Sequence, residues 1–272
     1  MADDEVLIER DGRVAWITLN RPERLNALNA PLLRRFGEAV DELGADPATS
    51  VLVIRGAGRA FSAGYDLKPD ESEVGQAHER TIVEDYDRLL GHIKLFERLW
   101  DLPKPVIAAV HGYCLAGATQ LCIFCDITVV ADDAKVGWPS IPVGGGLISP
   151  MWSFLVGPKR AKQMSFVAGS QVSGATSADW GWANYSVPEA ELWDNVAALA
   201  GQIAKVPLPT LRMKKASINR VAEIQGFRSA MSMGAETDAL LHFSPEVIEL
   251  HELIKSKGLK GAIAEFNGSE AS

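Results

Sequence analysis

The chain has 272 residues, of which 47% are hydrophobic and 23% charged, and its formal net charge at pH 7 is −8. These values are ordinary for a globular protein, and the length allows one large domain or a core with an appended region. The negative charge argues against nucleic acid as the default partner, because phosphate backbones bind to basic surfaces. No apolar run reaches the ~18 residues of a membrane span. The first twelve residues, MADDEVLIERDG, lack the apolar segment of a signal peptide. We therefore expect a cytoplasmic protein with no membrane partner.

Three cysteines, Cys114, Cys122 and Cys125, are an odd number and do not suggest a disulfide framework. Cys122 and Cys125 form a CxxC, but no second CxxC or histidine pair accompanies them. The pattern favours small buried hydrophobic residues over a zinc or redox site. We therefore expect no metal.

The first third of the chain alternates strand and helix signals. The pattern predicts two strands over residues 6–9 and 14–19, joined by an Asp11-Gly12 turn. Asn29 is placed as the N-cap of a helix over 31–43, and the continuous apolar run 50–55 predicts a buried strand. This strand leads into GAGRAFSAGYDLK, a loop rich in glycine and alanine that allows the backbone to approach another group closely.

The stretch 105–126, PVIAAVHGYCLAGATQLCIFCD, is the part of the sequence around which we interpret the rest of the chain. It begins as an apolar strand, passes through the small residues Ala116, Gly117 and Ala118, and continues as an apolar helix. The first N–H groups of a helix have no internal partner and attract negative charge. Paired with a second backbone donor, they would form an oxyanion hole.

The last part of the chain is mostly helical. An amphipathic helix over 78–100 precedes the central stretch, and helices are expected at 158–168, 175–181, 193–205 and 208–225. No flexible linker separates these regions. We expect a core over 1–200 that carries the site and a helical covering or oligomerisation region over 201–272.

Three blocks in register resemble the crotonase family, the enoyl-CoA hydratase/isomerase superfamily: NRPERLNALN, AFSAGYDLK and AAVHGYCLAGATQLCIFCDITVVADDAKVGWP. The resemblance covers essentially the whole chain. It implies an α/β fold, a spiral of repeated ββα units with a helical C-terminal region, assembled as a homotrimer or a dimer of trimers. It also implies an acyl-CoA thioester substrate, with coenzyme A as part of the substrate and no tightly bound cofactor.

The same resemblance assigns the site residues. The backbone N–H groups of Tyr65 and Gly117 would stabilise a thioester oxyanion or enolate. Residues that match the family's CoA-contacting positions are Arg24, Leu25, Ala27, Ala63, Asp66, Leu67 and Lys68.

Both acid–base positions depart from the hydratase pattern. The family's two glutamates correspond to Gln120 and Ser140, and neither side chain ionises near neutral pH. A hydratase that lacks both groups is expected to be slow by many orders of magnitude, because each contributes roughly 10²–10⁴-fold. Isomerases of the family rely on the second position, so Ser140 also counts against isomerisation.

Several reactions therefore remain open for an enzyme of this family: hydration, isomerisation, decarboxylation, C–C cleavage and thioester hydrolysis. The alternative is a non-catalytic acyl-CoA-binding or structural subunit. The resemblance also gives four further candidates for contact with the substrate, on a segment that often lines the acyl pocket in the family: His78, Glu84, Asp85 and Tyr86. His111 is interpreted as a structural histidine.

Overall fold

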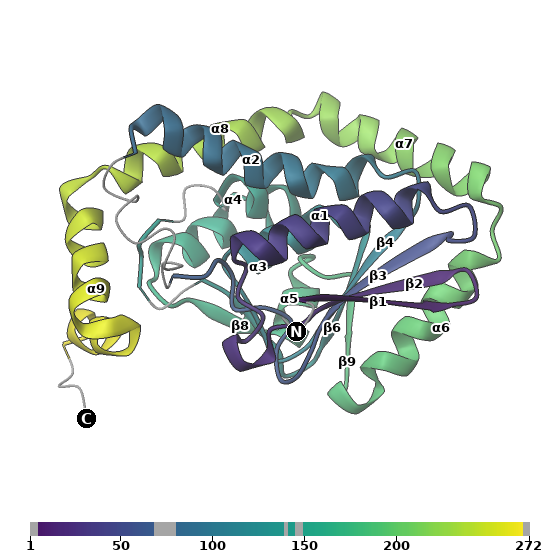
Figure 1. Cartoon of the computed structure of the whole chain (residues 1–272), viewed down its shortest axis with the longest axis horizontal. Helices are drawn as coiled ribbons and strands as arrows, with labels where there is room; N and C mark the ends of the chain where they lie inside the picture. The colour runs from purple at the N-terminus through teal and green to yellow at the C-terminus, as the bar shows by residue number, and fades with distance from the viewer. Residues whose placement is uncertain (1–4, 68–79, 139–140, 145–148, 269–272) are drawn as a thin grey trace.

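The computed structural model describes residues 5–67, 80–138, 141–144 and 149–268. A six-stranded sheet forms the centre of the molecule, with helices α1 (Ala30–Ala45) and α2 (Ile82–Asp101) on one side and α6 (Leu192–Ala204) on the other (Figure 1). The α7 and α8 helices (Leu208–Ile224 and Phe227–His242) continue the upper layer, and α9 (Pro245–Phe266) lies at one end of the body.

The central sheet has the order β1-β2-β3-β4-β6-β9. Its first two strands form an antiparallel hairpin, and all the other neighbours pair in parallel. The strands are β1 (Val6–Asp11), β2 (Val14–Leu19), β3 (Val51–Gly56), β4 (Val106–Val110), β6 (Ile127–Ala131) and β9 (Tyr185–Val187). Parallel strands need crossover connections, and here helices and loops supply them.

A second, three-stranded sheet has the order β5-β7-β8. Its strands are β5 (Tyr113–Leu115), β7 (Lys135–Gly137) and β8 (Gln171–Ser173). The remaining helices are α3 (Gly117–Ile123), α4 (Ser149–Phe166) and α5 (Gly174–Asp179), with short 3₁₀ turns at Pro22–Arg24 and Glu189–Glu191. Strand β5 immediately precedes α3, so this small sheet fixes the start of that helix.

Local sequence signals explain where the first helices begin. The Asn29 side chain accepts a hydrogen bond of 2.9 Å from the Leu32 N–H, so the predicted N-cap of α1 is confirmed. Thr81 and Glu84 form a reciprocal capping box at the start of α2, which begins at Ile82. One predicted helix differs: α4 joins the apolar segment before Gly157 to the predicted helix 158–168, with a kink at Gly157, where φ is 75°.

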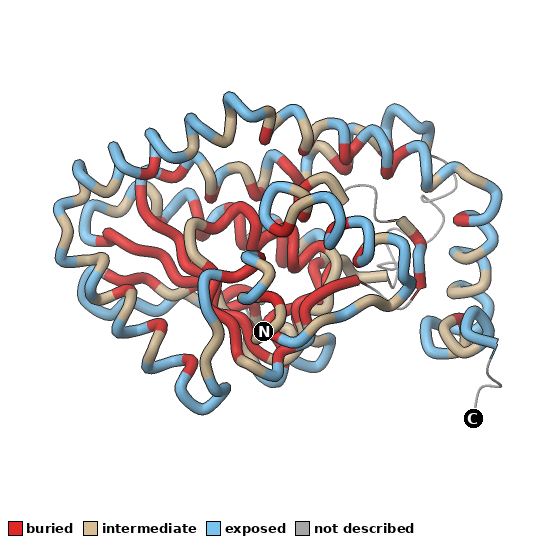
Figure 2. Tube along the Cα trace, turned by 180° about the vertical axis from the view of Figure 1, so that it is seen from behind, coloured by how far each residue is buried: buried red, intermediate tan, exposed pale blue. Residues whose placement is uncertain are grey.

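The hydrophobic core lies between the central sheet and the helices that cover it (Figure 2). All five residues of β4 are buried, as the continuous apolar run predicts. All three cysteines are buried and reduced, which agrees with their interpretation as small hydrophobic residues. The α/β fold class predicted from the sequence is confirmed.

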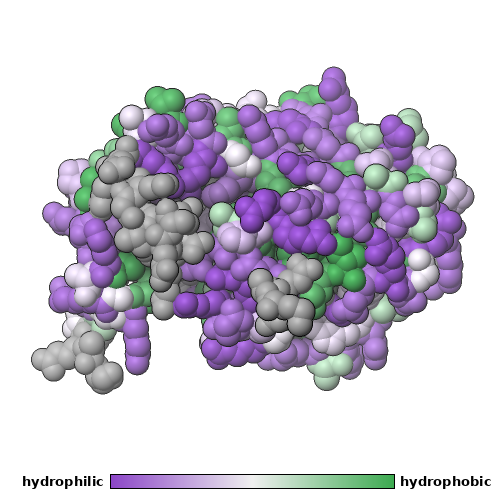
Figure 3. Space-filling model, viewed as in Figure 1, coloured by the Kyte–Doolittle hydropathy of each residue, from purple (hydrophilic) through white to green (hydrophobic). Residues whose placement is uncertain are grey.

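The C-terminal helices attach to the core through α2 and α4. Helix α8 packs along both, and α7 and α9 contact α8. The face seen in Figure 3 is mostly hydrophilic, with hydrophobic residues in small separate groups. Within the described part of the chain, none of the helices combines the length and the apolar composition needed to cross a membrane.

Candidate active site

A strained backbone turn begins α3. The chain runs from β4 through His111 and Gly112 into β5 and then reaches Ala116, whose φ of 48° is unusual for a residue other than glycine. The Ala116 N–H donates to the Gly137 carbonyl at 2.9 Å, which ties this turn to β7. A strained residue that its surroundings hold in place is a common feature of functional sites.

The glycine-rich loop 56–66 lies directly against this turn. Gly64 has a φ of 91°, and a Cβ at this position would lie 2.6 Å from the Leu115 carbonyl oxygen and 3.2 Å from the Gly117 nitrogen. Ser62 forms a parallel bridge with Cys114, and Leu28 forms one with Tyr65. The three sequence blocks that are far apart in the chain therefore meet at one place.

Two backbone donors at this meeting point have no backbone acceptor among the described residues. Among the residues that the structure describes, neither the Tyr65 nor the Gly117 N–H donates to a backbone carbonyl. The residues on either side of Tyr65 do form backbone hydrogen bonds. The Asp66 N–H donates to the Leu28 carbonyl at 3.1 Å, and the Gly64 carbonyl accepts from the Leu28 N–H at 2.8 Å. Unpaired N–H groups in a folded interior are uncommon and indicate a place for an acceptor.

The Tyr65 side chain also belongs to the site, which the sequence alone did not indicate. Its hydroxyl donates to Gln120 Oε1 at 2.7 Å, and a Cβ at Gly117 would lie 2.5 Å from its ring. Burial raises the pKa of Tyr65, partly offset by the charge of Arg88 and reinforced by Asp238. The phenol therefore stays protonated at physiological pH, and its hydroxyl is engaged in the hydrogen bond to Gln120.

Gln120 is fully buried, and only the oxygen of its side-chain amide has a hydrogen-bond partner among the described residues. Its exposed fraction is 0%, Oε1 accepts from Tyr65, and Nε2 has no partner among the described residues. A buried donor without an acceptor costs about 1–3 kcal/mol, so a ligand that accepts from Nε2 would recover this energy. Gln120 can thus orient a ligand but cannot transfer a proton.

His92 extends the site along α2. Its ring stacks on that of Tyr65 with centroids 4.7 Å apart, and Nδ1 is buried without a partner within the described residues. Burial, followed by the charge of Arg88, lowers the pKa of His92 to about 4. The imidazole beside the two N–H groups is therefore neutral at physiological pH.

This neutrality is directly measurable. We expect the His92 ring carbon resonances in an NMR pH titration to move only near pH 4, well below the ordinary histidine pKa of about 6.5. Because the folded-state pKa lies below the unfolded value, His92 reduces stability as the pH falls from about 6.5 towards 4. Titration of His92 near pH 6.5 would contradict the burial of its ring.

The first sequence block forms the outer wall of this region. Arg21 pairs with Asp66 at 3.0 Å and with Glu5 at 3.2 Å, and it donates to the Ala27 carbonyl. The Ala63 N–H donates to the Leu25 carbonyl at 2.9 Å. The structure thus brings together the two loops that contain the predicted CoA-contacting residues Arg24, Leu25, Ala27, Ala63, Asp66 and Leu67. The sequence did not single out Arg21, which holds Asp66 in place.

Three predicted residues, Lys68, His78 and Ser140, lie outside the described residues. His111, interpreted as structural, is buried and its Nε2 lies 2.8 Å from the Gly58 carbonyl oxygen. Among the described residues, no group of three or more histidine, cysteine or acidic side chains is arranged to hold a metal ion.

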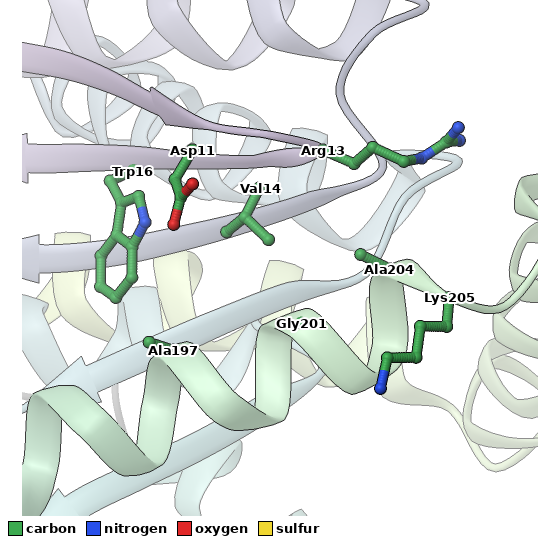
Figure 4. A pocket seen from close by; sticks show the side chains of 8 residues that line it. All are labelled: Asp11, Arg13, Val14, Trp16, Ala197, Gly201, Ala204 and Lys205. Atoms are coloured by element: carbon green, nitrogen blue, oxygen red, sulfur yellow. The ribbon is translucent and has the colours of Figure 1, made fainter.

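A cavity of about 350 Å³ lies elsewhere, between the β1–β2 hairpin and α6 (Figure 4). In this view Trp16 and Val14 point towards α6, whereas the Arg13 side chain extends away from them. The lining residues are Asp11, Arg13, Val14, Trp16, Ala197, Gly201, Ala204 and Lys205. This cavity contains none of the residues that surround the two free N–H groups.

The structure is that of an α/β protein in which the backbone N–H groups of Tyr65 and Gly117 lack backbone acceptors among the described residues. Comparison with known proteins identifies the family. Residues 9–241 match the model of the enoyl-CoA hydratase/isomerase family. A crystal structure from Novosphingobium aromaticivorans DSM 12444, named as an enoyl-CoA hydratase/isomerase, superposes with a TM-score of 0.90 at 40% identity, covering 98% of this chain and 96% of that one.

Two curated relatives show the same relationship. A short-chain-enoyl-CoA hydratase of Clostridium acetobutylicum is 31% identical over 97% of this chain and 94% of its own. A hydroxycinnamoyl-CoA hydratase-lyase of Pseudomonas fluorescens is 32% identical over 80% of this chain and 79% of its own. The chain belongs to the enoyl-CoA hydratase/isomerase family.

Proposed function

We propose that this protein is an enzyme that binds an acyl-CoA thioester and stabilises its oxyanion through the backbone N–H groups of Tyr65 and Gly117. The observation that carries the proposal is the pair of N–H groups that have no backbone acceptor within the described part of the chain, where the second and third sequence blocks meet. Its family relatives include proteins named as enoyl-CoA hydratases, which supports a thioester substrate. Because α3 has only seven residues, the directed N–H groups matter more here than the dipole of the helix.

The reaction in this proposal is not rapid hydration of a simple enoyl-CoA. Gln120 and Ser140 occupy the positions of the family's two glutamates, and Gln120 is held by Tyr65 in an orientation that leaves only an amide donor free. An amide hydrogen bond can position a substrate, but general acid–base catalysis requires a group that exchanges a proton. Decarboxylation agrees best with these residues, because loss of CO2 forms the enolate without a protein base, and the two N–H groups would stabilise that enolate.

We further propose the family's trimer or dimer of trimers as the assembly. Large apolar side chains are exposed along the C-terminal helices of the single chain, and burial against another copy would remove them from water. They are Met213, Ile218, Val221, Ile224, Met233 and Leu240.

A panel of acyl-CoA thioesters, followed by mass spectrometry of the products, tests the function. We expect turnover of at least one member, and hydration of crotonyl-CoA at least ~10²-fold slower than by a family hydratase with both glutamates, measured in parallel. Hydration of crotonyl-CoA at the rate of that control would refute the altered chemistry. Binding of thioesters without turnover of any member would support the non-catalytic alternative.

A further inference from the structure

The carbonyl of Ala116 accepts a hydrogen bond from a buried side chain in addition to its bonds with the backbone of α3. Thr119 Oγ1 donates to this carbonyl at 2.8 Å, and Trp152 Nε1, on α4, donates to Thr119 Oγ1 at 3.1 Å. An indole can only donate, so the proton of the threonine hydroxyl is directed at the Ala116 carbonyl. Both side chains are fully buried. A directed chain of hydrogen bonds therefore runs from α4 to the turn that begins α3.

This carbonyl and the Gly117 N–H belong to the same peptide group. The bond between Ala116 and Gly117 is trans, so its C=O and N–H point in opposite directions. The carbonyl points into α3, where the N–H groups of Thr119 and Gln120 donate to it at 2.9 and 3.4 Å. The Gly117 N–H therefore points away from the body of the helix. Any contact that fixes the carbonyl also fixes the direction of this N–H.

The Ala116–Gly117 peptide needs such a restraint. Ala116 has φ 48° and ψ −121°, a combination that a residue with a side chain rarely adopts, and such strain persists only where neighbouring contacts maintain it. The Ala116 N–H is held by the Gly137 carbonyl at 2.9 Å. Gly117 itself resists rotation of the peptide only weakly, because glycine allows a wide range of φ. The hydrogen bonds to the Ala116 carbonyl therefore hold the second half of the turn.

Pairing of buried polar groups alone does not explain why the chain of hydrogen bonds includes Thr119 and Trp152. The Ala116 carbonyl already accepts from two backbone N–H groups, and a buried hydroxyl costs more than the methyl group of a valine at the same position. Trp138 and Trp182 are also buried, and their Nε1 atoms have no partner among the described residues. The fold thus tolerates an unpaired indole, whereas the indole of Trp152 is directed at the threonine.

We propose that Thr119 and Trp152 are positioning residues, which hold the Ala116–Gly117 peptide in the orientation that lets Gly117 donate to the thioester oxyanion. The inference rests on the proposed function, because it assumes that the Gly117 N–H is an oxyanion donor. A donor that is held in place before the reaction stabilises developing charge without a cost of reorganisation. Both side chains act through the backbone, so they affect the turnover number more than the binding of the CoA moiety.

Two substitutions of Thr119 separate its hydroxyl from its packing. Valine keeps the shape without the hydroxyl, and serine keeps the hydroxyl without the methyl group. On the most rapidly converted thioester of the panel, we expect Thr119→Val to lower the turnover number about tenfold with KM unchanged, because two backbone N–H groups still hold the carbonyl. Thr119→Ser should keep the wild-type turnover number. A Thr119→Val enzyme that unfolds earlier but turns over at the wild-type rate would overturn the inference.

Trp152→Phe removes the N–H that directs the hydroxyl, and Trp182→Phe is its matched control. The two rings stack with centroids 5.8 Å apart and both are buried, but only Trp152 donates to Thr119. We expect Trp152→Phe to lower the turnover number about threefold, less than Thr119→Val because the hydroxyl remains, and Trp182→Phe to leave it unchanged. Combining Trp152→Phe with Thr119→Val should add no further loss. Multiplied losses in the double variant would overturn the chain.

The Gly117→Pro background shows through which group Thr119 acts. Because proline carries no N–H, adding Thr119→Val should change the turnover number by less than about twofold. A tenfold loss in this background would overturn the inference. If Gly117→Pro and Gly117→Ala are equally active, the proposed function fails. If Gly117→Pro loses activity relative to Gly117→Ala while Thr119→Val keeps the wild-type rate, this inference alone fails.

Infrared spectroscopy of bound acetyl-CoA, isotope-labelled at its carbonyl carbon, tests the same point without turnover. Hydrogen bonds to the thioester oxygen polarise the carbonyl and lower its stretching frequency, and the short acyl group needs little space. We expect the lowest frequency in the wild-type protein and Thr119→Ser, a higher one in Thr119→Val and the highest in Gly117→Pro. Equal frequencies in Thr119→Val and the wild-type protein would overturn the inference. Failure of the wild-type protein to bind acetyl-CoA or any thioester of the panel would overturn the proposed function.

Discussion

Replacing Gly117 with proline is expected to reduce the turnover number on the preferred thioester by ~10²–10³-fold, which is the usual loss when one oxyanion donor is removed. This loss comes in addition to any effect of adding a side chain at position 117. Proline lacks the N–H that is the proposed donor but is tolerated in the first turn of a helix. Gly117 is the first residue of α3, so the intrahelical hydrogen bonds do not depend on its N–H. Steady-state kinetics on the substrate found in the panel provide the measurement.

Gly117→Ala is the matched control for this variant. Any Cβ at position 117 meets the Tyr65 ring, at 2.5 Å from Cε2, so both variants displace that ring. Only the proline variant removes the donor. The ratio of the two turnover numbers therefore measures the contribution of the Gly117 N–H to turnover. Equal activities of the two variants, with both folded by circular dichroism, would show that the Gly117 N–H does not stabilise the transition state.

Much of this site follows from local sequence signals. The cap at Asn29, the glycines of the loop 56–66 and the small residues before α3 each act over a few neighbouring positions, and the structure places them as expected. Glycine is required at 64 because its positive φ and the nearby Leu115 carbonyl exclude a side chain. Such constraints can be read from one sequence, because they concern the backbone of the residue itself.

The side-chain pairs of the site could not be read in the same way. Tyr65 and Gln120 are 55 positions apart, and Asp85 and His242 are 157 apart. Helical periodicity predicts that Asp85 and His92 share a face of α2, but it does not say which helix covers that face. The partner is determined by how α8 packs on α2, which depends on the whole chain. For this reason the sequence placed Asp85 among several candidates and did not connect it with His242.

The residue whose replacement we expect to affect stability most, Lys215, also acts through long-range contacts that the sequence alone does not predict. Lys215 on α7 is 7% exposed, and its ammonium group binds Asp126 Oδ2 at 2.8 Å and the carbonyls of Leu99 and Lys104 at 2.7 and 3.1 Å. Asp126 also accepts from the Val106 N–H at 2.7 Å, at the start of β4. One lysine thus joins a C-terminal helix to the end of α2 and to the strand that leads to α3.

Lys215→Met is expected to lower the free energy of unfolding by about 3–5 kcal/mol, the usual cost of leaving one buried charge without its partner. Urea unfolding followed by circular dichroism, at one protein concentration, measures this cost. Lys214→Met is the matched control, because the neighbouring lysine is exposed and its loss should change stability by less than about 0.5 kcal/mol. Similar losses from both variants would contradict a specific role for Lys215.

The pH dependence of this loss identifies its cause. Burial raises the pKa of Asp126, and Lys215 offsets part of that increase. Without the lysine, the folded state favours the protonated carboxyl still more, so the variant binds a proton more strongly when folded than when unfolded. Its deficit should therefore grow as the pH rises through the range above the ordinary Asp pKa of about 4 and shrink below it. The double variant Lys215→Met, Asp126→Asn should recover part of the stability at neutral pH, because it removes the unpaired charge but leaves the Leu99 and Lys104 carbonyls without their donor.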